Sequence, residues 1–216
     1  MVPDPLVIRI AQRVQRRRVS ATRIVGVLLA AGQGSRFGAD KLLAPLPSPS
    51  FGSPEPGIVG AKACAALAAV LPTPIAVIRP GDHRLAMVLQ AHGADVIECP
   101  RAPEGMGASL ACAVAAAPDA IGWVIALADM PWIRPDTIAR VADAIAGGAI
   151  VAAPFYDGRR GHPVGFGRAC HAELVGLSGD EGARAVLARH AGDLWQIPVD
   201  DPGILRDVDT PADLRG

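Results

Sequence analysis

Small residues and cations follow one another closely in an early segment of the chain. The segment Leu29-Ala30-Ala31-Gly32-Gln33-Gly34-Ser35-Arg36-Phe37-Gly38 comes directly after an apolar run, and Lys41 follows soon after it. Small side chains let backbone N–H groups approach an anion, and Arg36 and Lys41 add positive charge. Backbone donors together with cations suit a polyphosphate. The segment therefore predicts a loop that binds the phosphates of a nucleotide.

Two commoner phosphate-binding loops are excluded by the spacing of these residues. The dinucleotide fingerprint requires G-x-G-x-x-G, whereas three residues separate Gly34 from Gly38. The P-loop requires Gly-Lys followed by Ser or Thr, whereas Lys41 stands between Asp40 and Leu42. A glycine-rich turn with incidental cations is the remaining alternative, and it is the weaker interpretation.

Carboxylates stand at two later places where a cation could bind. Asp129 directly follows the apolar run 123–128, which predicts a strand buried on both faces. Near the C-terminus Asp207 and Asp209 lie two residues apart, so in an extended segment they point to the same side. Carboxylate oxygens are appropriate ligands for Mg²⁺, which neutralises phosphate oxygens in phosphoryl-transfer sites. We expect Mg²⁺ on Asp129 with Asp209 or Asp207, although Asp209 before Thr210 and Pro211 also fits a helix cap.

Weaker signals suggest contacts to the base and to a second substrate. Gly105 permits a close backbone approach before a small-residue helix, and Ser109 offers a hydroxyl group. Arg79 to Gly81 follows an apolar run and is a candidate for the base pocket, with an ordinary turn as the equal alternative. His162 stands in Gly158 to Val164 beside two arginines, a combination that suits an anionic acceptor. Asp180 could be the N-cap of the next helix, a role that would not exclude a contact with a ligand.

The elements that must position these residues alternate along the chain. Short apolar runs at 24–29, 75–78, 95–98, 123–127, 150–153 and 194–199 predict strands, and helical patterns occupy 59–69, 83–91, 106–116, 135–146 and 181–190. This alternation is typical of a parallel sheet joined by crossover helices. Ligands bind beyond the carboxyl ends of such strands, so we expect the loop after 24–29 and Asp129 at one edge. The proline-rich segment 45–57 predicts a surface loop.

Composition limits the partners of the chain. Its 21 basic and 21 acidic residues balance, so no overall charge favours nucleic acid or an anionic membrane. No apolar run approaches the roughly 20 residues of a membrane helix. The four cysteines are far apart and suggest neither a zinc site nor a disulfide framework. We expect a cytoplasmic protein with small-molecule partners, in which residues 1–23 form an arginine-rich extension and 24–216 a single domain.

Several of these motifs together resemble a known family. The pattern L-A-A-G-x-G-x-R-F-G-x-x-K is similar to the loop of small-molecule nucleotidyltransferases, in particular the molybdenum-cofactor cytidylyltransferases. The family's L-x-D-x-P, G-M-x-x-S-L, G-x-x-G-H-P-V, G-D-x-G-A-R and D-V-D-T-P also have matches here. Guanylyltransferase relatives usually carry two glycines where this chain has Ala31-Gly32, which favours CTP over GTP. An asparagine that is common in the family is replaced by Cys99-Pro100.

The resemblance implies a fold, a reaction and a set of site residues. The fold would be an α/β three-layer sandwich with a mostly parallel, Rossmann-like sheet, as in nucleotide-diphospho-sugar transferases. The reaction would transfer CMP from CTP to the phosphate of a molybdopterin-type cofactor, with Mg²⁺ and release of pyrophosphate. The resemblance also suggests contact with a molybdoenzyme or its chaperone. The implied residues are Lys41, Arg36 and Asp129 for catalysis; Leu29, Ala30, Ala31, Gly32, Gly34, Arg36, Lys41, Arg79, Gly81, Gly105 and Ser109 for the nucleotide; Gly161, His162, Asp180 and Arg184 for the acceptor; and Asp129, Asp209 and Asp207 for the metal.

Two alternatives to this function remain open from the sequence. The first is a nucleotidyltransferase on the same scaffold whose acceptor is an isoprenoid precursor or a sugar phosphate. The second is an accessory protein that binds a nucleotide or cofactor without turnover. Lys41 and Asp129 argue against the second, whereas the proline-rich segment 45–57 and the missing asparagine leave room for it.

Overall fold

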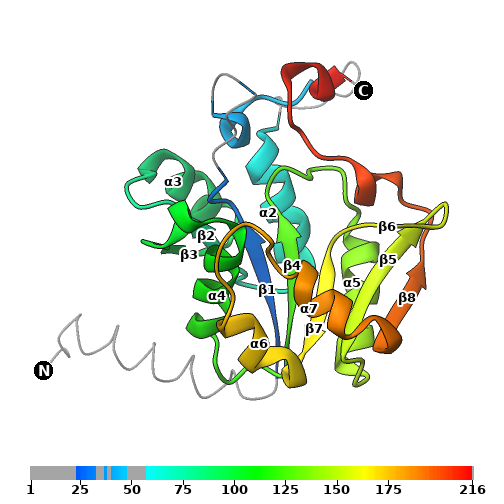
Figure 1. Ribbon diagram of the computed structural model, residues 1–216. Coiled ribbons are helices and arrows are strands. Elements are labelled where there is room, and N and C mark those ends of the chain that lie inside the picture. Colours follow the sequence, from blue (N-terminus) through cyan, green and yellow to red (C-terminus); the bar gives the residue numbers. More distant parts are fainter. Residues whose placement is uncertain (1–22, 33–36, 38–39, 48–56, 216) are drawn as a thin grey trace, which may run out of the picture.

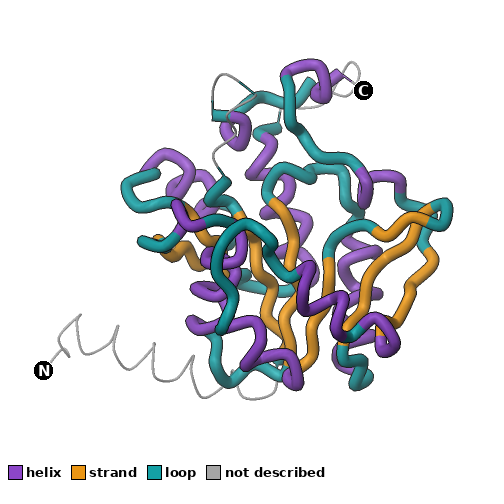
Figure 2. The backbone as a smooth tube through the Cα atoms, in the orientation of Figure 1, coloured by secondary structure: helices purple, strands orange, loops and turns teal. Residues whose placement is uncertain are grey.

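A central sheet with helices on both faces forms the body of the protein (Figure 1). The computed structural model describes residues 23–32, 37, 40–47 and 57–215. The tube in Figure 2 shows the strands side by side in the middle and the helices outside them. The expected three-layer α/β fold is confirmed.

The sheet has eight strands in the order β3-β2-β1-β4-β7-β5-β6, and β8 pairs with β5. Strands β1, β2, β3 and β4 pair in parallel, as do β5 and β8. The antiparallel strand β7 lies between β4 and β5, so the sheet is mostly parallel with one reversed strand inside it. The bounds are β1 Ile24–Leu29, β2 Ile75–Ile78, β3 Asp95–Glu98, β4 Gly122–Leu127, β5 Val151–Tyr156, β6 Arg159–Arg160, β7 Val164–Gly167 and β8 Leu194–Pro198.

Alternation of side chains along the strands divides the core into two layers. On β1, Val25 and Val27 belong to the hydrophobic cluster that includes α4, α6 and α7, whereas Leu28 belongs to the cluster under α2, α3 and α5. Both faces of β1 and β4 are therefore buried, as continuous apolar runs predict. The helices are α2 Val59–Val70, α3 His83–Ala91, α4 Met106–Ala116, α5 Pro135–Ala146, α6 His171–Val175 and α7 Arg184–Arg189, with 3₁₀ turns η2 Lys41–Leu43, η3 Ala102–Glu104, η4 Arg168–Cys170, η5 Ala191–Asp193, η6 Pro202–Leu205 and η7 Pro211–Arg215.

Most elements lie where the sequence patterns predict them, and the differences are local. The strands at 24–29, 75–78 and 95–98 and the helices at 83–91, 106–116 and 135–146 have the expected bounds. The elements β6, β7 and α6 were not predicted. The last expected helix begins only at Arg184, and its N-cap is Ala183, so the interpretation of Asp180 as that cap was wrong.

The two ends of the proline-rich segment 45–57 pair with each other, and one residue there is buried. Pro45 forms an isolated bridge with Ile58, and Leu46 is buried and donates its N–H to the carbonyl of Gly57. Residues 48–56 of this segment and residues 1–22 of the predicted extension lie outside the described residues.

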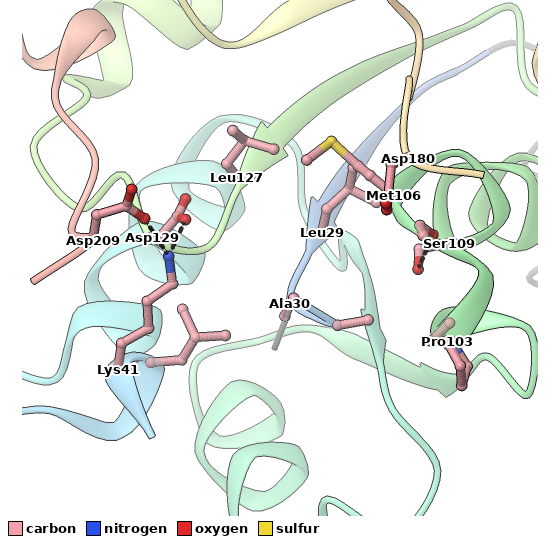
Figure 3. Close-up of a pocket in the computed structure, with 15 residues that line it drawn as sticks. Leu29, Ala30, Lys41, Pro103, Met106, Ser109, Leu127, Asp129, Asp180 and Asp209 are labelled. Atoms are coloured by element: carbon pink, nitrogen blue, oxygen red, sulfur yellow. Dashed lines mark hydrogen bonds and ion pairs between the residues drawn. The ribbon is translucent and has the colours of Figure 1, made fainter. Parts of the chain in front are cut away.

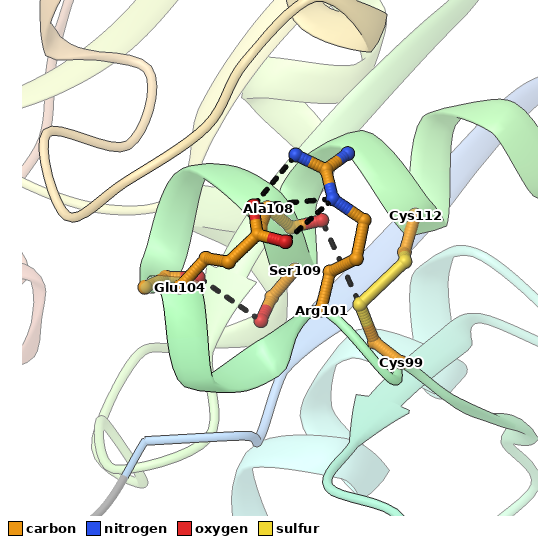
Figure 4. The surroundings of a disulfide bond; sticks show 7 residues. Cys99, Arg101, Glu104, Ala108, Ser109 and Cys112 are labelled. Atoms are coloured by element: carbon orange, nitrogen blue, oxygen red, sulfur yellow. Dashed lines mark hydrogen bonds and ion pairs between the residues drawn. A yellow bond between two sulfur atoms is a disulfide. The ribbon is translucent and has the colours of Figure 1, made fainter.

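A disulfide corrects the expectation that no cysteines pair. Cys99 follows β3, Cys112 lies on α4, and their Cα atoms are 6.2 Å apart (Figure 4). The 13-residue separation gave no pairing signal, because the turn η3 brings the chain back so that α4 lies beside the end of β3. Cys64 and Cys170 are free and buried. No helix among the described residues is long and apolar enough to span a membrane.

Candidate active site

A cavity of about 590 Å³ opens at the carboxyl ends of β1 and β4. Strand β1 pairs with β2 on one side and with β4 on the other, so the strand order reverses here. Such a switch point is where open α/β sheets bind ligands. The volume lies within the range of about 300–1,000 Å³ that is typical of small-molecule sites. Its lining residues are Leu29, Ala30, Ala31, Gly32, Lys41, Leu42, Ala102, Pro103, Gly105, Met106, Ser109, Leu127, Asp129, Asp180 and Asp209.

One end of the cavity holds a lysine between two carboxylates (Figure 3). The Nζ atom of Lys41 lies 2.7 Å from Oδ2 of Asp129 and 3.3 Å from Oδ1 of Asp209. Lys41 begins η2, where the side chain of Asp40 caps the turn by accepting the N–H of Leu42. Asp129 follows β4, and Asp209 lies in the C-terminal segment. Three distant parts of the chain thus bring their charges to one point.

The charges at this end perturb one another. Burial alone lowers the pKa of Lys41, but hydrogen bonds to Asp129 and Asp209 and their negative charge outweigh it and hold the pKa above its usual value. Desolvation raises the pKa of the Asp207 carboxyl group, and the charges of Asp129 and Asp209 add to this effect. The side chain of Lys41 is only 11% exposed. A buried ammonium group held by two carboxylates is therefore charged at neutral pH.

The same carboxylates fit a divalent cation. Asp129, Asp207 and Asp209 each offer an oxygen, and these oxygens lie within 4.8 Å of one another. Two oxygens on opposite sides of Mg²⁺ at 2.0–2.1 Å are about 4.2 Å apart, so a small inward movement of the side chains is sufficient. The Oδ1 atom of Asp129 is buried and has no hydrogen-bond partner among the described residues. Hard oxygen donors with one unused buried oxygen suit Mg²⁺ or Mn²⁺.

The C-terminal segment is fixed to the loop after β4, and this positions Asp207 and Asp209. The N–H of Val208 donates to the carbonyl of Asp129 at 2.9 Å. The guanidinium carbon of Arg206 lies 4.1 Å above the centre of the Trp132 ring, a cation–π contact. The cluster of carboxylates therefore depends on contacts that lie outside the cavity itself.

Asp201 holds this segment at its other end. Its carboxylate is 2% exposed and accepts hydrogen bonds from the N–H of Arg134, the hydroxyl of Thr137 and the N–H of Gly203. A side chain at Gly203 would overlap the carbonyl of Trp132, so the segment approaches the loop after β4 as closely as glycine permits.

The opposite end of the cavity lies at the start of α4. Gly105 has φ +127°, and a Cβ atom there would overlap the carboxylate of Asp180. The N–H of Gly107 donates to the carbonyl of Gly179 at 2.8 Å, and Ser109 Oγ donates to the carbonyl of Gly105. Figure 3 shows Asp180 beside Met106 and Ser109, away from Lys41. Asp180, which the family pattern assigns to the acceptor, therefore shares this end with two residues predicted for the nucleotide.

Between the two ends lies the start of the predicted phosphate loop. Leu29, Ala30, Ala31 and Gly32 line the cavity, and the N–H of Ala30 donates to the carbonyl of Val77 at the end of β2. This bond fixes where the chain leaves the sheet. Gly34 and Arg36, both predicted to contact phosphate, lie outside the described residues.

Some predicted residues do not line the cavity. Arg79 and Gly81 lie in the turn after β2, where the N–H of Gly81 donates to Glu98. Arg184 begins α7, and Gly161 follows β6. Asp207 reaches the carboxylate cluster from outside the lining set. The binding roles of these residues stay predictions.

His162 does not line the cavity, but the charge of Asp129 at the carboxylate end acts on its ring. The backbone N–H of His162 donates to the carbonyl of Ile204 in the C-terminal segment. Burial lowers the pKa of the imidazole and Arg160 lowers it further, against the opposing charge of Asp129. The ring is therefore neutral at pH 7, and its Nδ1 has no hydrogen-bond partner among the described residues. Its assignment to the acceptor site stays a prediction.

Sequence reasoning missed several residues that line or support the site. Leu42, Leu127 and Met106 flank the motifs and were not assigned roles, although their positions next to Lys41, Asp129 and Gly105 were a usable signal. The supporting contacts of Asp201 with Thr137 and of Arg206 with Trp132 join segments far apart in the sequence, and no local pattern marks them.

The chain resembles known proteins in both sequence and structure. Residues 26–194 match the family model of the MobA-like NTP transferase domain. The purine catabolism protein PucB of Bacillus subtilis (strain 168) is 31% identical over 200 residues, covering 88% of this chain and 93% of PucB. The crystal structure of Rv0371c from Mycobacterium tuberculosis H37Rv has a TM-score of 0.73 at 29% identity, covering 90% of this chain and 96% of that chain. A complex of Rv0371c with manganese has a TM-score of 0.71 at 27% identity, with the same coverage of 90% and 96%.

Proposed function

Because the chain belongs to the MobA-like NTP transferase domain family, we propose that it transfers CMP from CTP to the phosphate of a molybdopterin-type acceptor in a Mg²⁺-dependent reaction. Its class, a nucleotidyltransferase of the MobA-like type, follows from the family; the nucleotide, the acceptor and the metal are the proposed part. The observation that carries the proposal is the meeting of Lys41, Asp129 and Asp209 at one end of the cavity.

The charges of the cavity give the nucleotide an orientation. Lys41 is the one cationic side chain among the described lining residues, so the triphosphate lies at its end. At the other end, the carbonyl of Gly179 already accepts from the first turn of α4, and the Asp180 carboxylate adds negative charge. This end repels phosphate and suits the N–H groups of a base. The base therefore lies near Gly105 and Ser109.

The reaction that fits this orientation is a substitution at the α-phosphorus. An oxygen of the acceptor phosphate forms a bond to that phosphorus, the bond to the bridging oxygen breaks, and pyrophosphate leaves. Lys41, Arg36 and the backbone N–H groups of Ala31 and Gly32 stabilise the charge that develops on the phosphate oxygens. No nucleophile or general base from the protein is required, because the attacking oxygen is already anionic.

The metal would be held by Asp129 with Asp209 or Asp207. Bound there, Mg²⁺ supplies positive charge to the phosphate oxygens. Support for a divalent cation comes from the three carboxylate oxygens within 4.8 Å of one another and from the manganese complex of Rv0371c. Asp209 is the better candidate, because it lines the cavity whereas Asp207 does not.

The preference for CTP and for a pterin acceptor rests on the family motifs. Ala31 stands where guanylyltransferases usually carry glycine, and it is a buried residue of the cavity lining. Gly161 and His162 carry the acceptor motif near the carboxylate end, with Arg160 as a nearby cation. The family motif assigns Asp180 and Arg184 to the acceptor, but Asp180 lines the end of the cavity where the base is placed here, so only Arg184 is kept for the acceptor.

The experiment that tests this function is pyrophosphate release from CTP with a molybdopterin-type acceptor and Mg²⁺. We expect Lys41→Ala to lower turnover by about 10²-fold or more, the cost of losing one preorganised group that stabilises charge. Lys62→Ala is the matched control, because Lys62 is the only other lysine of the chain and is exposed on α2. Equal turnover of Lys41→Ala and the wild type would exclude the proposed role.

A further inference from the structure

The ammonium group of Lys41 occupies the place that the carboxylates offer to a cation. Its distances of 2.7 Å to Asp129 and 3.3 Å to Asp209 are those of a direct ion pair, and both carboxylates belong to the cluster described above. Figure 3 shows the side chain of Lys41 extended toward both of them. Three carboxyl groups so close together require a counter-charge, and here Lys41 supplies it.

We propose that Lys41 and the divalent cation are alternative occupants of this carboxylate cluster. In the absence of metal, Lys41 holds Asp129 and Asp209 in position. When a metal–nucleotide complex binds, the ammonium group leaves the carboxylates and pairs with the phosphates. This inference rests on the proposed function, because it requires the cluster to be the metal site.

Space and charge make the two occupants exclusive. A divalent cation binds carboxylate oxygens at about 2.0–2.2 Å, inside the distances at which Lys41 now contacts the same two side chains. An ammonium group held there would lie against the metal and repel it, because both carry positive charge. A cation that binds the two oxygens contacted by Lys41, Oδ2 of Asp129 and Oδ1 of Asp209, can enter only if Lys41 moves.

The cavity gives Lys41 a second position. The residue lines the cavity along with Ala30 to Gly32, where the triphosphate is expected, and its side chain is a flexible stem on the short turn η2. The phosphates bring the negative charge that replaces the lost carboxylate contacts. When the metal binds alone, it displaces Lys41 and no phosphate charge replaces the lost carboxylate contacts. When metal and nucleotide bind together, the phosphates replace those contacts. Binding of the two is therefore coupled.

The first test measures Mn²⁺ binding without nucleotide, by the electron paramagnetic resonance signal of free Mn²⁺. Lys41→Met keeps an apolar stem and removes the charge, so we expect it to bind Mn²⁺ about tenfold more tightly than the wild type. Lys62→Met should bind like the wild type. With CTP present the order should reverse, because Lys41→Met has lost its phosphate contact. Equal or weaker Mn²⁺ binding by Lys41→Met without nucleotide would overturn the proposal.

A second measurement uses the unchanged protein and does not depend on the folding of a variant. Lys41 and Lys62 are the only lysines of the chain, so [¹³C]lysine labelling gives two sets of side-chain signals, which Lys62→Met assigns. Addition of Mg²⁺ to saturation should move the Cε signal of Lys41 and leave that of Lys62 unchanged. A Lys41 signal that does not respond to saturating Mg²⁺ would show that the ion pair persists beside the metal.

Asp129→Asn separates this proposal from the proposed function. Loss of Mn²⁺ binding in Asp129→Asn, together with unchanged binding in Lys41→Met, would refute the exchange while the metal site stands. Full Mn²⁺ binding by Asp129→Asn would remove the metal site itself, and with it both proposals.

Discussion

The buried carboxylate of Asp201 is the contact whose loss should connect stability with activity. It accepts hydrogen bonds from Arg134 N at 2.9 Å, Thr137 Oγ1 at 2.7 Å and Gly203 N at 3.0 Å, and so joins α5 to the segment that carries Asp209. We predict that Asp201→Ala destabilises the fold and weakens metal binding at a site to which Asp201 contributes no ligand.

The size of the effect follows from the burial of these groups. A hydrogen bond to a charged partner contributes about 1.5–3 kcal/mol, and donors left without an acceptor in a buried place lose that stabilisation. Removal of the buried charge offsets part of the loss, because the carboxylate no longer has to be desolvated. We expect the free energy of unfolding to fall by about 3–5 kcal/mol in Asp201→Ala and by about 1.5–2 kcal/mol in Thr137→Val, which removes one donor. For a chain of this size the larger loss lowers the Tm by roughly 10 °C.

The assay is urea unfolding of the wild type, both single variants and the double variant. Because Thr137 and Asp201 bond directly, their effects should not add, and the coupling free energy should be about 1 kcal/mol or more. Mn²⁺ affinity is then measured well below the Tm of each variant. Because Asp207 and Asp209 lose part of their support in Asp201→Ala, we expect its Mn²⁺ affinity to fall. Turnover should fall as well, by up to about 10²-fold, which is the cost of a displacement of about 1 Å at such a site.

Three results would contradict this reasoning. A loss below about 1 kcal/mol in Asp201→Ala would mean that the buried acceptor does not hold the segment. Strictly additive losses in the double variant would mean that the bond between Thr137 and Asp201 contributes nothing. Destabilisation with unchanged Mn²⁺ affinity would show that the C-terminal segment keeps its carboxylates in place without this anchor.

Three further predictions concern other parts of the molecule. Asp129→Asn should lower Mg²⁺-dependent pyrophosphate release by about 10²–10³-fold with an unchanged circular dichroism spectrum, and near-normal turnover would contradict its role. The hydrogen bond between Glu173 and His190 raises the pKa of His190 from 6.5 and lowers that of Glu173 from 4.5. The stabilisation from this hydrogen bond is therefore fully present between about pH 4.5 and pH 6.5. It is lost as the pH rises through the raised pKa of His190 or falls through the lowered pKa of Glu173. The Tm difference between the wild type and Glu173→Gln should shrink above that window, and a constant difference would contradict the prediction. A thiol reductant should lower the free energy of unfolding by about 3 kcal/mol, because it opens the Cys99–Cys112 bond. Cys112→Ser should abolish this response to the reductant. A wild type whose stability does not respond would argue against the bond.

The parts of the fold that the sequence predicts well are those with a local signal. Strand β1 is a continuous apolar run, and α5 combines Pro135 at its start with a regular apolar stripe, so both have the expected beginning. Strand β7 is Val-Gly-Phe-Gly, and its two glycines carry no strand signal. It forms because it pairs with β4 on one side and with β5 on the other, contacts that only the folded chain supplies.

The site divides in the same way. The loop from Leu29 and Asp129 could be predicted, because each follows a buried strand at the end where ligands bind. The contact of Asp180 with Gly105 could not, since it joins residues 75 positions apart through the close approach of two backbone segments. The pairing of Cys99 with Cys112 was missed for a related reason, because it depends on the path of the turn η3.

The proposed function is tested most directly by pyrophosphate release in the presence of Mg²⁺, measured for each of the four nucleoside triphosphates with molybdopterin-type, isoprenoid and sugar-phosphate acceptors. We predict the highest turnover with CTP and the molybdopterin-type acceptor, and its loss in Asp129→Asn. Release of pyrophosphate only with another acceptor would contradict the assigned substrate. Absence of turnover with every pair, in a protein that still binds a nucleotide, would contradict the transfer reaction itself.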